Sequence, residues 1–172
     1  MIPIDLTCPT GAIFSPDRIF RYVLWRIWSQ SRPLLMCTGL NPSKASETVT
    51  DPTVTQVCVR ADRAGFGGLL MTNMYGFVST DPKRLLEDSD HVGPENDAYL
   101  REMIRLAGRH LCAWGAFPAA AKREAVVLAM FKDPYCLGVT QGGHPRHPLR
   151  ISYDTPMVPY RPAQLEALPC RK

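Results

Sequence analysis

Short apolar runs alternate along the chain with segments whose apolar residues recur at helical spacing. Four continuous apolar runs predict strands buried on both faces of a sheet; they occupy residues 34–38, 69–74, 111–114 and 135–139. The first of these runs breaks off at Gly39 and Pro42. Residues 20–25 alternate roughly between apolar and polar positions, which predicts a further strand at an edge of the sheet.

Capping signals mark the starts of the predicted helices. Asp51 at the cap position and Pro52 in the first turn predict a helix that Gly65 ends. Further helices are predicted to begin at residues 81–82 and 93–95 and to cover residues 118–130. Asp51 and the acidic group at 95–97 are therefore expected to cap helices and to stabilise first turns rather than to act in a site.

Strands that alternate with helices predict one α/β domain of three layers. Helices cover both faces of a mostly parallel central sheet of about four strands. The domain spans residues 1–172 and includes a proline-rich C-terminal tail from Tyr153. Ligands of such sheets bind at the carboxyl ends of the strands. That rule selects the loops at residues 41–44, 73–77, 115–117 and 141–150.

Composition narrows the setting of this domain. A length of 172 residues suits one domain, and a net charge of +4 permits nucleic-acid binding without requiring it. The six cysteines form no Cys-x-x-Cys pair, which predicts free thiols rather than an iron–sulfur or zinc site. We find no signal-peptide pattern and no apolar stretch long enough to span a bilayer, so we expect a cytoplasmic protein without membrane contact, with a monomer favoured.

Nearly the whole chain resembles DUF1643, a family of uncharacterised bacterial and phage domains. The segments that carry the resemblance follow one another in order and are residues 39–43, 51–53, 65–69, 80–82, 92–97, 113–115 and 143–149. The resemblance implies membership of the family, and it carries no function with it.

Two of these segments also resemble motifs of the uracil-DNA glycosylase superfamily. Residues 39–42, Gly-Leu-Asn-Pro, are similar to the Gly-x-Asn-Pro motif of its mismatch-specific and single-strand-selective branches. Residues 144–149, His-Pro-Arg-His-Pro-Leu, are similar to its second motif, His-Pro-Ser-Pro-Leu, with one residue inserted. The resemblance implies a uracil-DNA glycosylase-like fold and a hydrolase that removes a modified or damaged base from DNA.

Cleavage of an N-glycosidic bond needs a positioned water on one side of the sugar and a group that stabilises the departing base on the other. We expect Asn41 to orient the water through its amide carbonyl and His144 to donate to the base. The plainer alternatives are a turn formed by Asn41 before Pro42 and a histidine packed in a proline-rich turn. A metal site at His144 and His147 lacks a visible third ligand, so we expect no metal and no other cofactor.

A flipped base also needs a pocket. We expect Asn73 to read the base edge, and Tyr75 and Phe77 either to stack on the base or to belong to the core. The other substrate-binding candidates surround Asn41; they are Gly39, Leu40, Pro42 and Ser43. The nucleic-acid-binding candidates, which would contact phosphates or fill the space left by the base, are Lys44, Arg146, His147, Leu149 and Arg150.

DNA with a modified or damaged base is therefore the expected partner. Two alternatives from other classes stay open. One is a non-catalytic nucleic-acid-binding module that keeps the base pocket. The other is a hydrolase or binder of free nucleosides or nucleotides, which the modest charge slightly favours.

Overall fold

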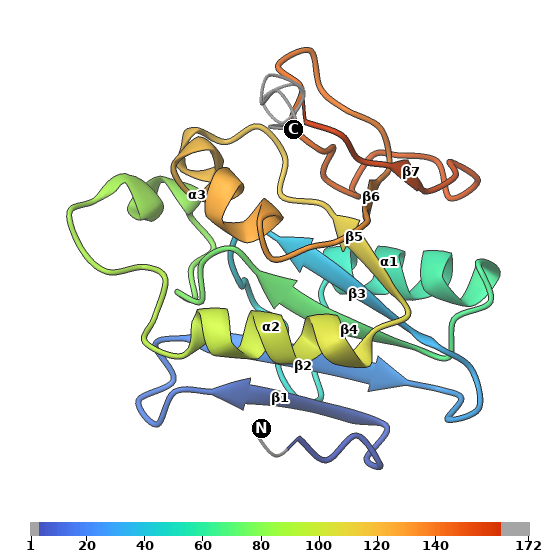
Figure 1. Cartoon of the computed structure of the whole chain (residues 1–172). Helices are drawn as coiled ribbons and strands as arrows, with labels where there is room; N and C mark the ends of the chain where they lie inside the picture. The colour runs from blue at the N-terminus through green and yellow to red at the C-terminus, as the bar shows by residue number, and fades with distance from the viewer. Residues whose placement is uncertain (1–3, 163–172) are drawn as a thin grey trace, which may run out of the picture.

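A computed structural model describes residues 4–162, which form one seven-stranded sheet flanked by helices (Figure 1). The strands are β1 (Thr10–Phe14), β2 (Arg21–Ile27), β3 (Leu34–Gly39), β4 (Gly68–Asn73), β5 (Arg109–Cys112), β6 (Pro134–Cys136) and β7 (Val158–Pro159). Their order across the sheet is β1-β2-β4-β3-β5-β6-β7.

The centre of this sheet is parallel and its margins are antiparallel. β3 pairs with β4 on one side and with β5 on the other, and β5 pairs with β6, all in parallel. β2 and β1 extend the sheet beyond β4 as antiparallel strands, and β7 pairs antiparallel with β6. The mixed α/β class is confirmed, but the prediction of about four mostly parallel strands was wrong, because the sheet is larger and mixed.

The outer strands explain this difference. Residues 20–25 belong to β2, which is buried along its whole length because β1 lies outside it, so the expected edge position was wrong. β1 contains Gly11, which leaves room for the ring of Trp25: an added Cβ would lie 2.1 Å from that ring. A short strand built around glycine has too few apolar residues to stand out in the sequence. β7 has two exposed residues and gives no hydrophobic signal.

Helices cover both faces of the sheet. α1 (Pro52–Arg63) packs against one face, and α2 (Asn96–Leu106) and α3 (Pro118–Leu128) pack against the other (Figure 1). Each face of the sheet has its own apolar core beneath its helices. The capping prediction for α1 is confirmed, since Asp51 Oδ1 accepts a hydrogen bond of 2.8 Å from the backbone nitrogen of Val54. A 3-10 helix, η1 (Pro82–Leu86), follows Asp81.

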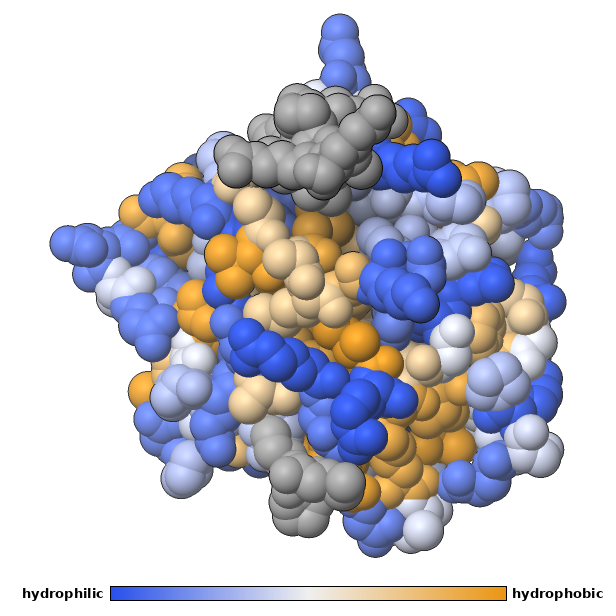
Figure 2. All heavy atoms as spheres, in the orientation of Figure 1, coloured by the Kyte–Doolittle hydropathy of each residue, from blue (hydrophilic) through white to orange (hydrophobic). Residues whose placement is uncertain are grey.

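The described part of the chain contains no helix that is both long and apolar enough to pass through a membrane. Its five cysteines, at positions 8, 37, 58, 112 and 136, are all free thiols; Cys170 lies outside the described residues, as does the second half of the proline-rich tail, residues 163–172. On the face with α2 and α3, apolar side chains are exposed between the two helices and hydrophilic ones surround them (Figure 2).

Candidate functional site

A cavity of about 240 Å³ lies at the carboxyl ends of β3 and β4. Its walls come from β2, the loop after β3, the start of α1, the segment before η1, the end of β5 and the loop after β6. Six of the residues predicted from the sequence line it: Gly39, Leu40, Asn41, Ser43, Asn73 and His147. Segments that are far apart in the chain thus meet where the strand-end rule places a ligand.

The ends of β3 and β4 are held in a fixed register beneath this cavity. The hydroxyls of Thr38 and Thr72 lie 2.9 Å apart across the two strands and are buried. One residue further, Gly39 pairs with Asn73. A Cβ added to Gly39 would lie 2.9 Å from Asn73 Oδ1 and 3.1 Å from Met71 Cε. Glycine at this position therefore leaves the space that the Asn73 amide occupies.

Asn73 is the most deeply buried of the predicted site residues, with 1% of its surface exposed. Its amide Nδ2 has no hydrogen-bond partner among residues 4–162. Its backbone is fixed from α2, because Asn96 Nδ2 donates to the Asn73 carbonyl at 3.1 Å. A buried donor without a partner is costly unless a ligand or water completes it, so this amide is available to a ligand or a water in the cavity.

The nitrogen and the oxygen of the Asn41 side-chain amide differ in their contacts. Its Nδ2 donates to the backbone oxygen of Ser79 at 2.8 Å and to that of Pro42 at 3.0 Å, which ties the loop after β3 to the segment before η1. The carbonyl Oδ1 accepts no hydrogen bond from a described residue. The expected alternative of a turn closed by the side-chain oxygen is therefore not seen, and the structural role of Asn41 uses only the nitrogen. It also fixes the orientation of the oxygen, which remains able to accept from a water.

His147 borders the cavity as a neutral imidazole. Its Nδ1 accepts a hydrogen bond of 3.3 Å from the backbone nitrogen of Leu149, which places the ring proton on Nε2. His147 as a whole is exposed, but the protein atoms packed around its ring exclude enough water to lower its pKa, and the negative charge of Asp51 offsets part of this effect. The ring is therefore a hydrogen-bond donor without a charge at neutral pH.

His144 does not line the cavity, although it was the predicted leaving-group residue. Its Nδ1 lies 2.9 Å from Glu124 Oε2 on α3. The other carboxylate oxygen of Glu124 accepts hydrogen bonds from Trp114 Nε1 at 3.1 Å and from the Tyr160 hydroxyl at 2.7 Å. His144 thus helps to fix the indole of Trp114, which is a wall of the cavity, and acts at one remove from it.

Among the lining residues that were not predicted to be site residues, three carry chemistry of interest. Arg21 and Trp114 are 2% exposed, and Asp51 lines the cavity while it caps α1. Trp114 is the second residue after β5 and belongs to the segment 113–115 that carries the family resemblance, so its position gave a usable signal. Arg21 gave none, because a basic residue at the start of a strand is ordinarily exposed.

The two aromatic candidates after β4 belong to the core. Tyr75 is 7% exposed and donates from its hydroxyl to the Ala119 carbonyl at 2.8 Å. Phe77 packs edge-on against His91 with ring centroids 4.9 Å apart. Neither lines the cavity, and the aromatic residue that does is Trp114.

The remaining candidates lie around the cavity rather than in it. Pro42 is buried and accepts a hydrogen bond from the backbone nitrogen of Ser79 at 3.0 Å. The exposed candidates sit on the same two loops as Ser43 and His147; they are Lys44, Arg146, Leu149 and Arg150. These positions suit contacts with a strand that crosses the mouth of the cavity.

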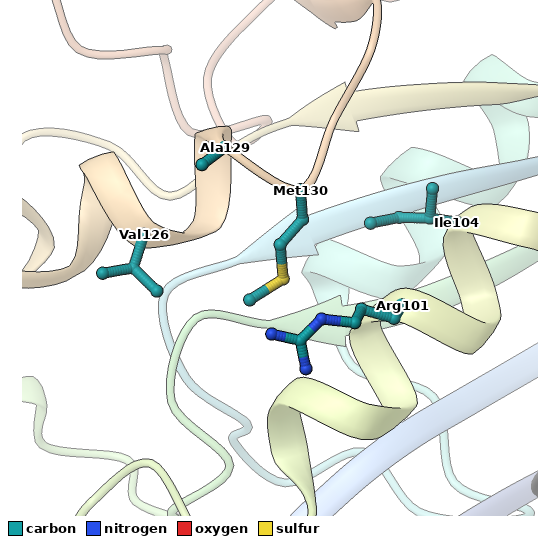
Figure 3. Close-up of a pocket in the computed structure, with 5 residues that line it drawn as sticks. All are labelled: Arg101, Ile104, Val126, Ala129 and Met130. Carbon is teal, nitrogen blue, oxygen red and sulfur yellow. The ribbon is translucent and has the colours of Figure 1, made fainter.

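The groove between α2 and α3 lacks this chemistry. This larger groove of about 480 Å³ lies between α2 and α3 and is lined by Arg101, Ile104, Val126, Ala129 and Met130 (Figure 3). It presents one guanidinium and otherwise aliphatic side chains, so it offers no acid, base or base-reading amide. Within residues 4–162, no three histidine, cysteine, aspartate or glutamate side chains are grouped to hold a metal ion.

Comparison with known proteins assigns the chain to a family. A family model described as a protein of unknown function, DUF1643, matches residues 21–149 of the 172-residue chain. The matched range begins at Arg21 and includes every predicted site residue except Arg150. No curated protein and no solved structure gives a match.

Proposed function

We propose, for this chain that belongs to the DUF1643 family, that the cavity holds a nucleobase and that the protein hydrolyses the N-glycosidic bond of a modified or damaged base in DNA. The observation that carries the proposal is that Asn41, Asn73 and His147 border one cavity although three different segments supply them. The cavity volume of about 240 Å³ accommodates one base rather than a whole duplex end, so the base has to leave the stack.

Asn41 positions the attacking water in this proposal. Water adds to the anomeric carbon as the bond to the base nitrogen breaks, and the electron pair of that bond stays with the base. The water loses one proton and the departing base gains one, so the products are a free base and an abasic sugar. A neutral amide is a weak base, but the reaction passes through an oxocarbenium-like sugar that needs an aligned water more than a strong base.

His147 takes the role first expected of His144. A neutral imidazole with its proton on Nε2 can donate a hydrogen bond to an oxygen or nitrogen of the departing base, and it needs no positive charge to do so. Asn73 supplies the amide that reads the base edge, and Trp114 supplies an aromatic surface. Within one cavity, these four residues would thus position the water, donate to the departing base, read the edge of the base and offer it an aromatic surface.

A hydrolase of free nucleosides or nucleotides is the second candidate. Two observations favour it: the cavity has room for one base, and the full chain has a modest net charge of +4. The exposed cations Lys44, Arg146 and Arg150 around the mouth favour a strand instead.

The experiment that tests the proposal is incubation of the protein with a panel of oligonucleotides that carry modified bases, single-stranded and paired, alongside the matching free nucleosides and nucleotides. Mass spectrometry detects released base and abasic sites. Release from an oligonucleotide that Asn41→Ala abolishes supports the proposal. Release from free nucleotides alone supports the second candidate. Tight binding without release in any arm supports a binding module.

A further inference from the structure

Arg21 reaches the cavity because of an irregularity in β2. Phe14 of β1 pairs with Arg21, whereas the preceding residue Ile13 pairs with Val23, so Tyr22 is an extra residue in β2. Such a bulge changes the face of the sheet to which the neighbouring side chains point, and bulges are often found beside active sites. Tyr22 and Val23 pack into the core under α2 and α3. Arg21 instead faces the side of α1, where it lines the cavity.

The guanidinium of Arg21 has little to balance it. It is 2% exposed, its Nη1 donates to the Ala45 carbonyl at 2.6 Å, and its Nε has no hydrogen-bond partner among the described residues. It forms no ion pair with a carboxylate in residues 4–162. Burial lowers the pKa of Arg21 to about 10, with Asp51 and Glu47 raising it and Arg26 lowering it further, so the group is still charged at neutral pH.

A second buried residue with an unsatisfied polar atom lines the same cavity. Asn73 Nδ2 is buried without a partner, and Asn73 is exposed to only 1%. The cavity is therefore lined by a buried cation and a free amide, and the only carboxylate among its lining residues is that of Asp51, which forms no ion pair with Arg21. A buried charge that no carboxylate contacts directly is unfavourable, and a ligand that brings a negative charge to the guanidinium would remove that penalty.

We infer that the cavity contains a site for an oxyanion group, a carboxylate or a phosphate, carried by the nucleobase or nucleotide that the cavity binds, with Arg21 as its cationic partner and Asn73 as a neutral donor. One part of the inference rests on the proposed function, namely that the oxyanion group is attached to a nucleobase or nucleotide. It adds a substrate class, since bases or nucleotides with an acidic group are selected over their neutral counterparts. A neutral keto oxygen would leave the Arg21 charge unbalanced, whereas a full negative charge matches it.

Arg26 provides a matched control for Arg21. It lies on the same strand, is 9% exposed, and donates to the Ser46 carbonyl at 2.7 Å and to the Val49 carbonyl at 3.1 Å. Both arginines therefore hold the loop after β3 through backbone oxygens, but Arg26 does not line the cavity. Arg26→Gln removes a buried cation and a loop contact, and it leaves the charge at the cavity in place.

The test compares two pairs of probes by isothermal titration calorimetry. The first pair is 5-carboxyuracil against uracil, which differ by a carboxylate on the base. The second pair is uridine 5′-monophosphate against uridine, which differ by a phosphate on the sugar. We expect the anionic member of one pair to bind at least about tenfold more tightly, as a charge-assisted contact typically provides. The pair that shows the preference identifies the source of the oxyanion.

Variants then connect this preference to Arg21. Arg21→Gln should abolish it, Arg21→Lys should retain part of it, and Arg26→Gln should leave it unchanged, with thermal unfolding used to confirm that each variant is folded. Equal binding of charged and neutral members by the unaltered protein would overturn the inference, as would a preference that Arg21→Gln retains. Because binding is measured without turnover, a preference without any base release would leave this site standing and remove the proposed hydrolysis alone.

Discussion

Gly39 and Asn73 are register partners at the ends of β3 and β4, and a Cβ added to Gly39 would lie 2.9 Å from Asn73 Oδ1. The two residues therefore depend on each other: the small one leaves the space in which the larger one is held. Because Asn73 is buried and its amide Nδ2 has no partner among the described residues, a shift of its side chain changes recognition before it changes the fold.

Gly39→Ala should weaken base binding more than it weakens the fold. The added methyl group has to displace the Asn73 amide or Met71 Cε, and overpacking of this kind typically costs about 1–3 kcal/mol. We expect a modest fall in the free energy of unfolding, measured in urea, together with loss of binding to the best probe. Gly142→Ala is the matched control, since its Cβ would meet nothing nearer than 3.4 Å. Unchanged binding in Gly39→Ala would show that Asn73 does not contact the ligand.

Asn41→Ala should slow base release and leave binding largely intact. The substitution removes the carbonyl that orients water, and positioned groups of this kind contribute about 10²–10⁴-fold in rate. It also removes the 2.8 Å bond to the Ser79 carbonyl, so thermal unfolding has to accompany the single-turnover rate. Asn41→Asp removes that donor too but keeps an acceptor for the water. Partial activity in Asn41→Asp with none in Asn41→Ala is the pattern expected for water positioning.

The two histidines of the loop after β6 should separate in function. His147→Ala removes a proposed donor to the departing base and should lower the rate by about 10²–10³-fold. His144→Ala removes the 2.9 Å contact with Glu124. It should lower the free energy of unfolding by about 1–2 kcal/mol, because the lost partner is a charged group that is partly exposed. The rate of His144→Ala should fall only a few-fold. The opposite order of rates would return the catalytic role to His144.

The pH dependence should report the protonation of His147. Its pKa lies below the ordinary value of 6.5 because burial disfavours the charged ring. The unfolded chain therefore takes up a proton before the folded protein does. The contribution of His147 to stability is present above pH 6.5 and is lost as the pH falls through the lowered pKa. Base release should follow the same acid limb, and His147→Gln should remove that limb from a plot of unfolding free energy against pH. Persistence of the limb in the variant would assign it to another group.

The central sheet could be predicted from the sequence, and its margins could not. Continuous apolar runs identify β3 and β4 because both faces of these strands are buried, and the capping residue Asp51 identifies α1. β1 escapes detection because its Gly11 accommodates the ring of Trp25, a contact between strands that no local pattern contains.

The site was predictable to a similar extent. Asn41 and Asn73 follow buried parallel strands, so the strand-end rule brings them together. The dipeptide His-Pro occurs twice in the loop after β6, at residues 144–145 and 147–148, and sequence alone does not decide which histidine faces the cavity. The position of Arg21 at the cavity depends on a bulge, in which β2 has one residue more than β1. Register shifts of this kind leave no trace in hydrophobic periodicity.

The central claim is that water adds to a sugar in the cavity at the position set by Asn41. The most direct measurement is a single-turnover reaction in ¹⁸O-labelled water with the modified-base oligonucleotide that the panel identifies, followed by mass spectrometry of both products. We predict one ¹⁸O atom at the anomeric carbon of the abasic sugar, none in the free base, and no such product with Asn41→Ala. Release of no base from any oligonucleotide, or label found in the base, would contradict the account.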